Sequence, residues 1–171
     1  NYQGGQSITS HLISLGKTSF AFIGDNGDHA PEFKARFNGY FETLKTHGLD
    51  QFSVQRDAIS TEDAGSEAVK SLLQSGELPQ AIVCASDLIA MGVLRALRQA
   101  KVNVPDDVAV VGYDNIAVSA YTTPSLTTVQ QNTKLAGELL VNTLLKAINN
   151  EEVQDYLMPA DIIIRQSCGS E

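Results

Sequence analysis

Residues 104–115 read VPDDVAVVGYDN, and this stretch decides the fold class. Pro105 and the two aspartates after it are typical of a solvated turn, because proline fixes the backbone and carboxylates stay in water. The continuous apolar run 108–111 then predicts a strand that is buried on both faces. Such strands occur in parallel sheets that carry helices on each side.

The residues after this run indicate a ligand site. Gly112 is expected to end the strand. Tyr113, Asp114 and Asn115 would then lie at its carboxyl end, which is the edge where open α/β sheets bind ligands. A carboxylate at this place can accept hydrogen bonds from paired hydroxyl groups; the alternative is that Asp114 only forms a turn.

Outward from this segment, helical and strand-like patterns alternate along nearly the whole chain, which predicts a doubly wound α/β fold with a mostly parallel sheet. Strands are expected near 20–24, 52–57, 81–85, 108–112, 127–129 and 162–164. Helices are expected before Gly16, near 32–47, over 62–75, from about 87 to 100 and near 133–149.

The composition limits the possible functions. The chain has 171 residues, enough for a sizeable core, and a formal net charge of −8. This acidity argues against direct binding of the DNA backbone, because that affinity comes from clustered lysine and arginine. No apolar run approaches the ~18 residues of a membrane span, so no membrane partner is expected. Cys84 and Cys168 lie in unlike settings, which suggests reduced thiols.

Motifs of catalysis or cofactor binding are absent from the sequence. It holds no Walker loop, no Gly-x-Gly-x-x-Gly and no nucleophile elbow. Its three histidines lie apart, without a carboxylate or thiolate at metal-ligand spacing. Asp25 and Asp28 could suggest a phosphoacceptor, although turn formation explains them more simply. We therefore expect neither an enzyme nor a cofactor or metal.

Five segments in register resemble the LacI/GalR family of transcriptional regulators. They are HLISLGKTSFAFIGD at 11–25, ARFNGY at 35–40, AIVCASDLIAMGVLRALRQA at 81–100, the opening segment together with PSLTTVQQ at 124–131, and IIIRQS at 162–167. The resemblance implies a periplasmic-binding-protein-like (type I) sensor of two lobes that binds a small-molecule effector between them. It also implies operator DNA as a partner, bound through an N-terminal helix-turn-helix that this stretch does not contain.

The resemblance also implies how the chain is divided. The chain begins without Met, where chains of the family cross into the second lobe, and it looks like a piece of a longer protein. Residues 1–171 would be effector-binding region, with 2–131 plus 160–171 as the second lobe. Residues 132–159, a helix and a strand near 153–158, would belong to a mostly missing first lobe. The leucine stripe of that helix would then lack its usual partner.

The resemblance marks several residues as ligand contacts. Arg36 matches an effector-binding arginine, and its guanidinium can hold two hydroxyls or a carboxylate; the alternative is a surface arginine paired with Glu32 one turn away. Asp114 matches an effector-binding aspartate. Ser86 matches a position that contacts effector in some members, although helix capping explains it equally well. Gln131 would place an amide at the hinge between the lobes, where ligand contact and hinge structure are equally good explanations.

Two departures from the family pattern bear on the ligand. Ser60 stands where the family often has an aromatic residue that stacks on the ligand ring, and Glu32 stands where some members carry a small hydroxyl residue. Both residues are counted among the candidate ligand contacts. A carboxylate at position 32 would repel an anionic ligand, which favours a neutral sugar, stacked on Phe33 or Tyr113.

Finally, the resemblance implies a side-by-side homodimer. Its interface would include the helix that begins at Asp87 and carries Met91 and Leu94, and the loop 117–121 with Tyr121. The alternative for Met91 and Leu94 is packing on their own sheet.

Three function classes share this fold. We expect a cytoplasmic regulator. The alternative is a periplasmic sugar-binding component of a transporter, which would differ in what precedes this stretch. An α/β enzyme that uses Asp25 or Asp114 as a base is disfavoured, because no nucleophile–base or metal constellation accompanies either residue.

Overall fold

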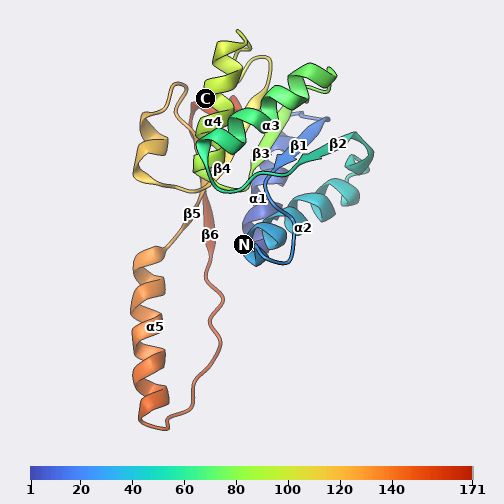
Figure 1. Cartoon of the computed structure of the whole chain (residues 1–171). Coiled ribbons are helices and arrows are strands. Elements are labelled where there is room, and N and C mark those ends of the chain that lie inside the picture. The colour runs from blue at the N-terminus through green and yellow to red at the C-terminus, as the bar shows by residue number, and fades with distance from the viewer. Residues whose placement is uncertain (171) are drawn as a thin grey trace.

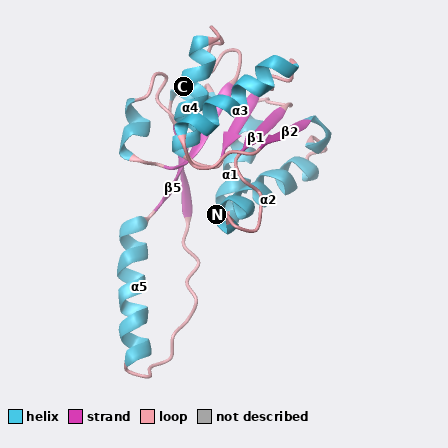
Figure 2. Cartoon of the chain, in the orientation of Figure 1, coloured by secondary structure: helices cyan, strands magenta, loops and turns pink. Residues whose placement is uncertain are grey.

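The computed structural model describes residues 1–170, which form a doubly wound α/β fold (Figures 1 and 2). The strands are β1 (Phe20–Ile23), β2 (Ser53–Arg56), β3 (Ala81–Cys84), β4 (Ala109–Asp114), β5 (Thr127–Gln131) and β6 (Ala160–Ile163). They form one sheet in the order β2-β1-β3-β4-β5-β6, in which only the β5–β6 pair is antiparallel. The predicted fold class is confirmed.

The α-helices are α1 (Tyr2–Ser14), α2 (Pro31–Thr46), α3 (Glu62–Ser75), α4 (Asp87–Gln99) and α5 (Thr133–Ile148), and the first four cover both faces of this sheet. Helices α1 and α2 pack together on one face, and α3 and α4 pack together on the other (Figure 1). Every residue of β1 and β3 is buried between these layers, as the apolar runs predict.

The point where the chain changes direction lies between β1 and β3. Strand β1 leads through α2 to β2 on one side, whereas β3 leads through α4 to β4 on the other. In open α/β sheets the crevice at such a switch point binds ligands. The carboxyl ends of β1 and β3 are therefore the expected location of a site.

Gly112 does not end its strand as the sequence suggested. Strand β4 continues through it to Asp114. A Cβ atom at this position would collide with a carboxylate oxygen of Asp87. Glycine is needed here because a helix start approaches the strand closely, and not because the strand stops.

The strand predicted near 153–158 is also not formed. Residues 151–159 have no regular structure, and the chain enters β6 at Ala160. A strand needs a neighbour for its backbone hydrogen bonds, and within residues 1–170 no strand pairs with this segment.

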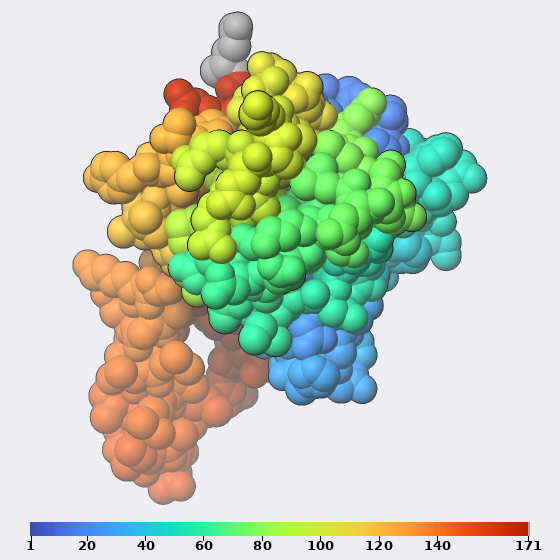
Figure 3. Space-filling view, turned by 45° about the horizontal axis from the view of Figure 1, so that its top comes forward, coloured from blue at the N-terminus to red at the C-terminus, as the bar shows by residue number. Residues whose placement is uncertain are grey.

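Helix α5 projects away from the rounded body (Figures 1 and 3). None of its residues is buried. Its apolar side chains are exposed as the leucine stripe predicts: Leu140 is 71% exposed and Ile148 66%. This amount of exposed apolar surface on one helix is unusual for a soluble domain.

The α3–α4 contact yields a stability prediction. A Cβ atom on Gly92 would collide with the backbone oxygen of Glu62. We expect Gly92→Ala to lower the free energy of unfolding by about 1–3 kcal/mol or more, because the helices must separate. Gly137 on α5 has no atom within 4 Å of its Cβ position. Gly137→Ala should therefore stabilise the helix by up to ~1 kcal/mol. Urea unfolding measures both, and equal effects would contradict the close-packing argument.

Candidate functional site

Arg36 lies at the switch point and holds three elements together. Its side chain comes from α2 and is only 6% exposed. One guanidinium nitrogen lies 3.0 Å from a carboxylate oxygen of Asp114, and another donates to the backbone oxygen of Ala85, just after β3. Its Nε donates to the side-chain oxygen of Asn1 at 3.0 Å. The alternative pairing with Glu32 is not seen among residues 1–170.

Two aromatic rings flank this guanidinium. Its central carbon lies 3.8 Å from the ring centre of Tyr113 and 5.3 Å from that of Phe33. Both are cation–π contacts, which favour a buried arginine. Tyr113 and Phe33 are only 2% and 7% exposed. The structure therefore contradicts the suggestion that a sugar ring stacks on either of them, because Arg36 and the core already cover these rings.

Asp114 ends β4 in an unusual backbone conformation. Its φ is 106°, and the next residue, Asn115, has a φ of 50°. Positive φ is uncommon outside glycine and tends to be kept at functional sites. Burial raises the pKa of the Asp114 carboxyl; Arg36 opposes this shift, and the negative charge of Glu32 adds to it. The Asp114 side chain remains 36% exposed, so its carboxylate can still accept hydrogen bonds from outside.

Three more of the predicted ligand residues lie at this edge. Ser60 Oγ and Ser86 Oγ are 2.8 Å apart. Ser86 is buried and also accepts the Ile89 N–H at 3.4 Å, so it caps α4. Gln131 donates to Asp114 at 3.4 Å. Helix capping by Ser86 is thus observed, while ligand contact by these residues stays a prediction.

Glu32 lies apart from these contacts. It is exposed in the first turn of α2, and its charge reaches Asp114 only over a distance. Its predicted ligand role is not tested by this arrangement.

Sequence reasoning missed several residues that build the site. Asn1 accepts hydrogen bonds from both Arg36 and Gln131. Thr128 and Arg165 hold the turn after Asp114, through contacts with Asn115 and the residues that follow it. These are single polar residues in apolar or loop segments, and no local pattern distinguishes them from ordinary strand or surface residues.

Of the four predicted dimer-interface residues, two are buried and two have exposed surface. Asp87 has no exposed surface, and its carboxylate is engaged inside the lobe, so its side chain cannot contact a second copy. Leu94 is only 7% exposed and packs mainly on its own sheet. Met91 is half-buried, whereas Tyr121 is 85% exposed. Met91 and Tyr121 remain the predicted contacts with surface to offer.

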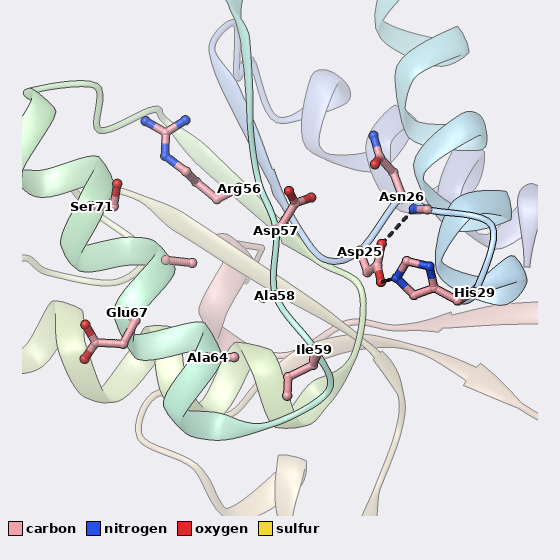
Figure 4. Close-up of a pocket in the computed structure, with 12 residues that line it drawn as sticks. Asp25, Asn26, His29, Arg56, Asp57, Ala58, Ile59, Ala64, Glu67 and Ser71 are labelled. Atoms are coloured by element: carbon pink, nitrogen blue, oxygen red, sulfur yellow. Dashed lines mark hydrogen bonds and ion pairs between the residues drawn. The ribbon is translucent and has the colours of Figure 1, made fainter.

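A hollow of about 740 Å³ lies at the carboxyl ends of β1 and β2, next to the segment that carries Ser60. Figure 4 shows its wall: the loop after β1, the segment after β2, and α3. His29 contacts Asp25 at 2.7 Å across its rim. The six predicted ligand residues do not line it.

The structure adds two further findings. Within residues 1–170, no group of three or more acidic, histidine or cysteine side chains is placed to hold a metal ion. Over the same range, no helix is both long and apolar enough to cross a bilayer.

An open, mostly parallel sheet with polar and charged side chains gathered at its switch point has the arrangement in which α/β proteins bind small ligands. Residues 9–168 match the family model of the periplasmic binding protein-like domain. The chain belongs to this family, and it is similar to the corresponding region of LacI-family transcriptional regulators.

Named relatives agree with this assignment. The ribose operon repressor of Escherichia coli (strain K12) is 36% identical over 166 residues, which cover 95% of this chain and 49% of the repressor. A LacI-family regulator from Enterococcus faecium, solved with bound ribose, has a TM-score of 0.88 at 26% identity, covering 97% of this chain and 62% of that one.

A second solved structure, the Lac repressor dimer bound to operator and an anti-inducer, has a TM-score of 0.91 at 26% identity and covers 98% of this chain and 50% of that one. The chain spans about half the length of the curated relatives it matches.

The buried Asp87 generates a pH prediction. Burial is the main cause that raises the pKa of this carboxyl from 3.8 to about 6. The folded protein therefore binds a proton that the unfolded chain releases between these values, so this group's contribution to stability is lost as the pH rises from about 4 to above 6. The loss is on the order of 3 kcal/mol.

Asp87→Asn should remove this contribution. Urea unfolding should show that the free energy of unfolding of the original protein falls relative to that of Asp87→Asn as the pH rises from 4.5 to 7.5. A difference that stays constant across this range would contradict the assigned shift.

Proposed function

We propose that this chain is the ligand-sensing region of a LacI/GalR-type transcriptional regulator. It binds a small hydroxyl-rich molecule between two lobes, and this binding controls the attachment of a separate helix-turn-helix to operator DNA. The observation that carries the proposal is the contact between Arg36 and Asp114 at the switch point of the sheet.

The free hydrogen-bonding capacity of this pair suits a sugar. A guanidinium has five N–H groups that can donate hydrogen bonds. In Arg36 three of them contact Asn1, Ala85 and Asp114, so two N–H groups are left for a ligand. The partly exposed Asp114 carboxylate can accept from neighbouring ligand hydroxyls. The hydroxyls of Ser60 and Ser86 lie at the same edge and can donate or accept.

The negative charge of Glu32 supports a neutral ligand, because it already disfavours the charged form of Asp114 and would repel an added anion. The names of two relatives, a ribose repressor and a ribose-bound regulator, point to the same class of ligand. We therefore propose a neutral sugar and take D-ribose as the probe.

The regulator is favoured over a transporter component because the named relatives are repressors and regulators. In this role the protein senses and does not catalyse. It would act in the cytoplasm, where operator DNA is found, and as a homodimer with Met91 and Tyr121 at the interface. A ligand that binds one closure state more tightly would shift the balance between the states.

We further propose that residues 132–159 belong to the other lobe of this sensor, with 2–131 and 160–171 forming the lobe described above. The exposed apolar face of α5 and the lack of structure over 151–159 support this division. In the full-length protein, other segments would cover this face.

The ligand site is tested by calorimetry on the full-length protein with D-ribose. We expect Asp114→Asn and Arg36→Lys each to weaken binding by about 10- to 100-fold, since each removes charge-assisted hydrogen bonds. Arg95→Lys is the matched control, because Arg95 forms an exposed pair with Asp63 on the far helix layer. Circular dichroism confirms folding. Unchanged affinity in both site variants would refute the proposed site, and no binding of any neutral sugar would refute the ligand class.

The division into lobes is tested on the 171-residue chain alone. We expect it to bind a hydrophobic dye and to self-associate, and we expect Leu140→Lys combined with Leu144→Lys to reduce both, because these residues are 71% and 60% exposed on α5. Phe52→Lys, at an exposed residue on the body, serves as the control. Monomeric behaviour without dye binding in sedimentation and fluorescence experiments would contradict the division.

A further inference from the structure

Asp87 is a buried carboxylate that the proposed ligand contacts do not use. It is the first residue of α4 and has no exposed surface. Burying a carboxylate is costly unless its oxygens accept hydrogen bonds. The groups that bind it therefore indicate what it does.

Both of its oxygens face the turn that follows Asp114. Oδ2 accepts the backbone N–H of Ile116 at 2.9 Å. Oδ1 accepts the hydroxyl of Thr128 at 2.6 Å, and this hydroxyl oxygen in turn accepts the backbone N–H of Asn115 at 3.3 Å. One carboxylate, that of Asp87, thus binds the N–H groups of both residues that follow Asp114. It binds the Ile116 amide directly and the Asn115 amide through the Thr128 hydroxyl.

This turn needs such support because of its backbone. Asp114 and Asn115 both have positive φ, a conformation that non-glycine residues keep only where their surroundings enforce it. The conformation turns the chain sharply at the end of β4 and sets the direction of the Asp114 side chain toward Arg36.

Two other features fit this function. Gly112 lies two residues before Asp114, and any larger residue there would displace the Asp87 carboxylate. On the other side of the turn, Arg165 donates to the side-chain oxygen of Asn115 at 2.7 Å and to the Leu126 backbone oxygen at 2.6 Å. The turn is therefore held from both sides.

We propose that Asp87, acting through Thr128 and the Ile116 amide, is a positioning residue that fixes the direction in which Asp114 faces the ligand. This inference rests on the proposed ligand site. Asp87 would not touch the ligand. A simpler role, stabilising the start of α4 by its negative charge, is the alternative.

The test uses the full-length protein and two readouts. The first is hydrogen exchange at the Asn115 and Ile116 amides without ligand. The second is the dissociation constant for D-ribose. We expect Asp87→Asn to speed exchange at both amides and to weaken binding at least fivefold. Asp63→Asn is the matched control, since Asp63 is an exposed acid in the first turn of α3 and should change neither readout.

A double-mutant cycle separates positioning from a general structural role. If Asp87 acts through Asp114, then Asp87→Asn should cost little further affinity when Asp114→Asn is already present. Fully additive losses would overturn the proposal, and so would an unchanged dissociation constant in folded Asp87→Asn protein.

Thr128 keeps the proposal testable if Asp87 variants do not fold. Thr128→Val should release the Asn115 amide and weaken binding, whereas Thr128→Ser should restore both. Equal behaviour of these two variants would overturn the proposal. If no sugar binds but the amides are still released selectively in Asp87→Asn, the hold on the turn is supported and the proposed ligand class fails.

Discussion

The buried guanidinium of Arg36 is the interaction on which the rest of the site depends. It is desolvated between two aromatic rings, and such a charge is tolerated only when its donors meet acceptors. Those acceptors come from the start of the chain, from the end of β3 and from the end of β4. Segments far apart in the sequence are therefore held at one point by the requirement to satisfy one charge.

The fold could be predicted well from local patterns because its central strands are buried on both faces. The continuous apolar runs at β1, β3 and β4 have few other interpretations in a chain where helical periodicity alternates with them. A single residue is less informative than such a run. Glycine at position 112 predicts the end of a strand, but β4 continues through it and its missing side chain makes room for Asp87.

The candidate site was predictable only in part. Arg36 and Asp114 were found because family motifs mark them, and the structure brings them together. The partners that orient them were not found, because Thr128, Arg165 and Asn1 act through long-range hydrogen bonds that leave no local pattern. The family resemblance places the helix of Asp87 at an interface, but the burial of its side chain depends on β4 and β5, which pack against it and are distant in sequence.

The glycines between α3 and α4 have a mechanical consequence. Gly65 and Gly92 bring the two backbones into direct contact, with no flexible side chains between them that could yield to a small movement. We therefore expect the two helices to move as one rigid body. Ser60 lies just before α3 and Ser86 caps α4, so a displacement of α4 would move both hydroxyls together.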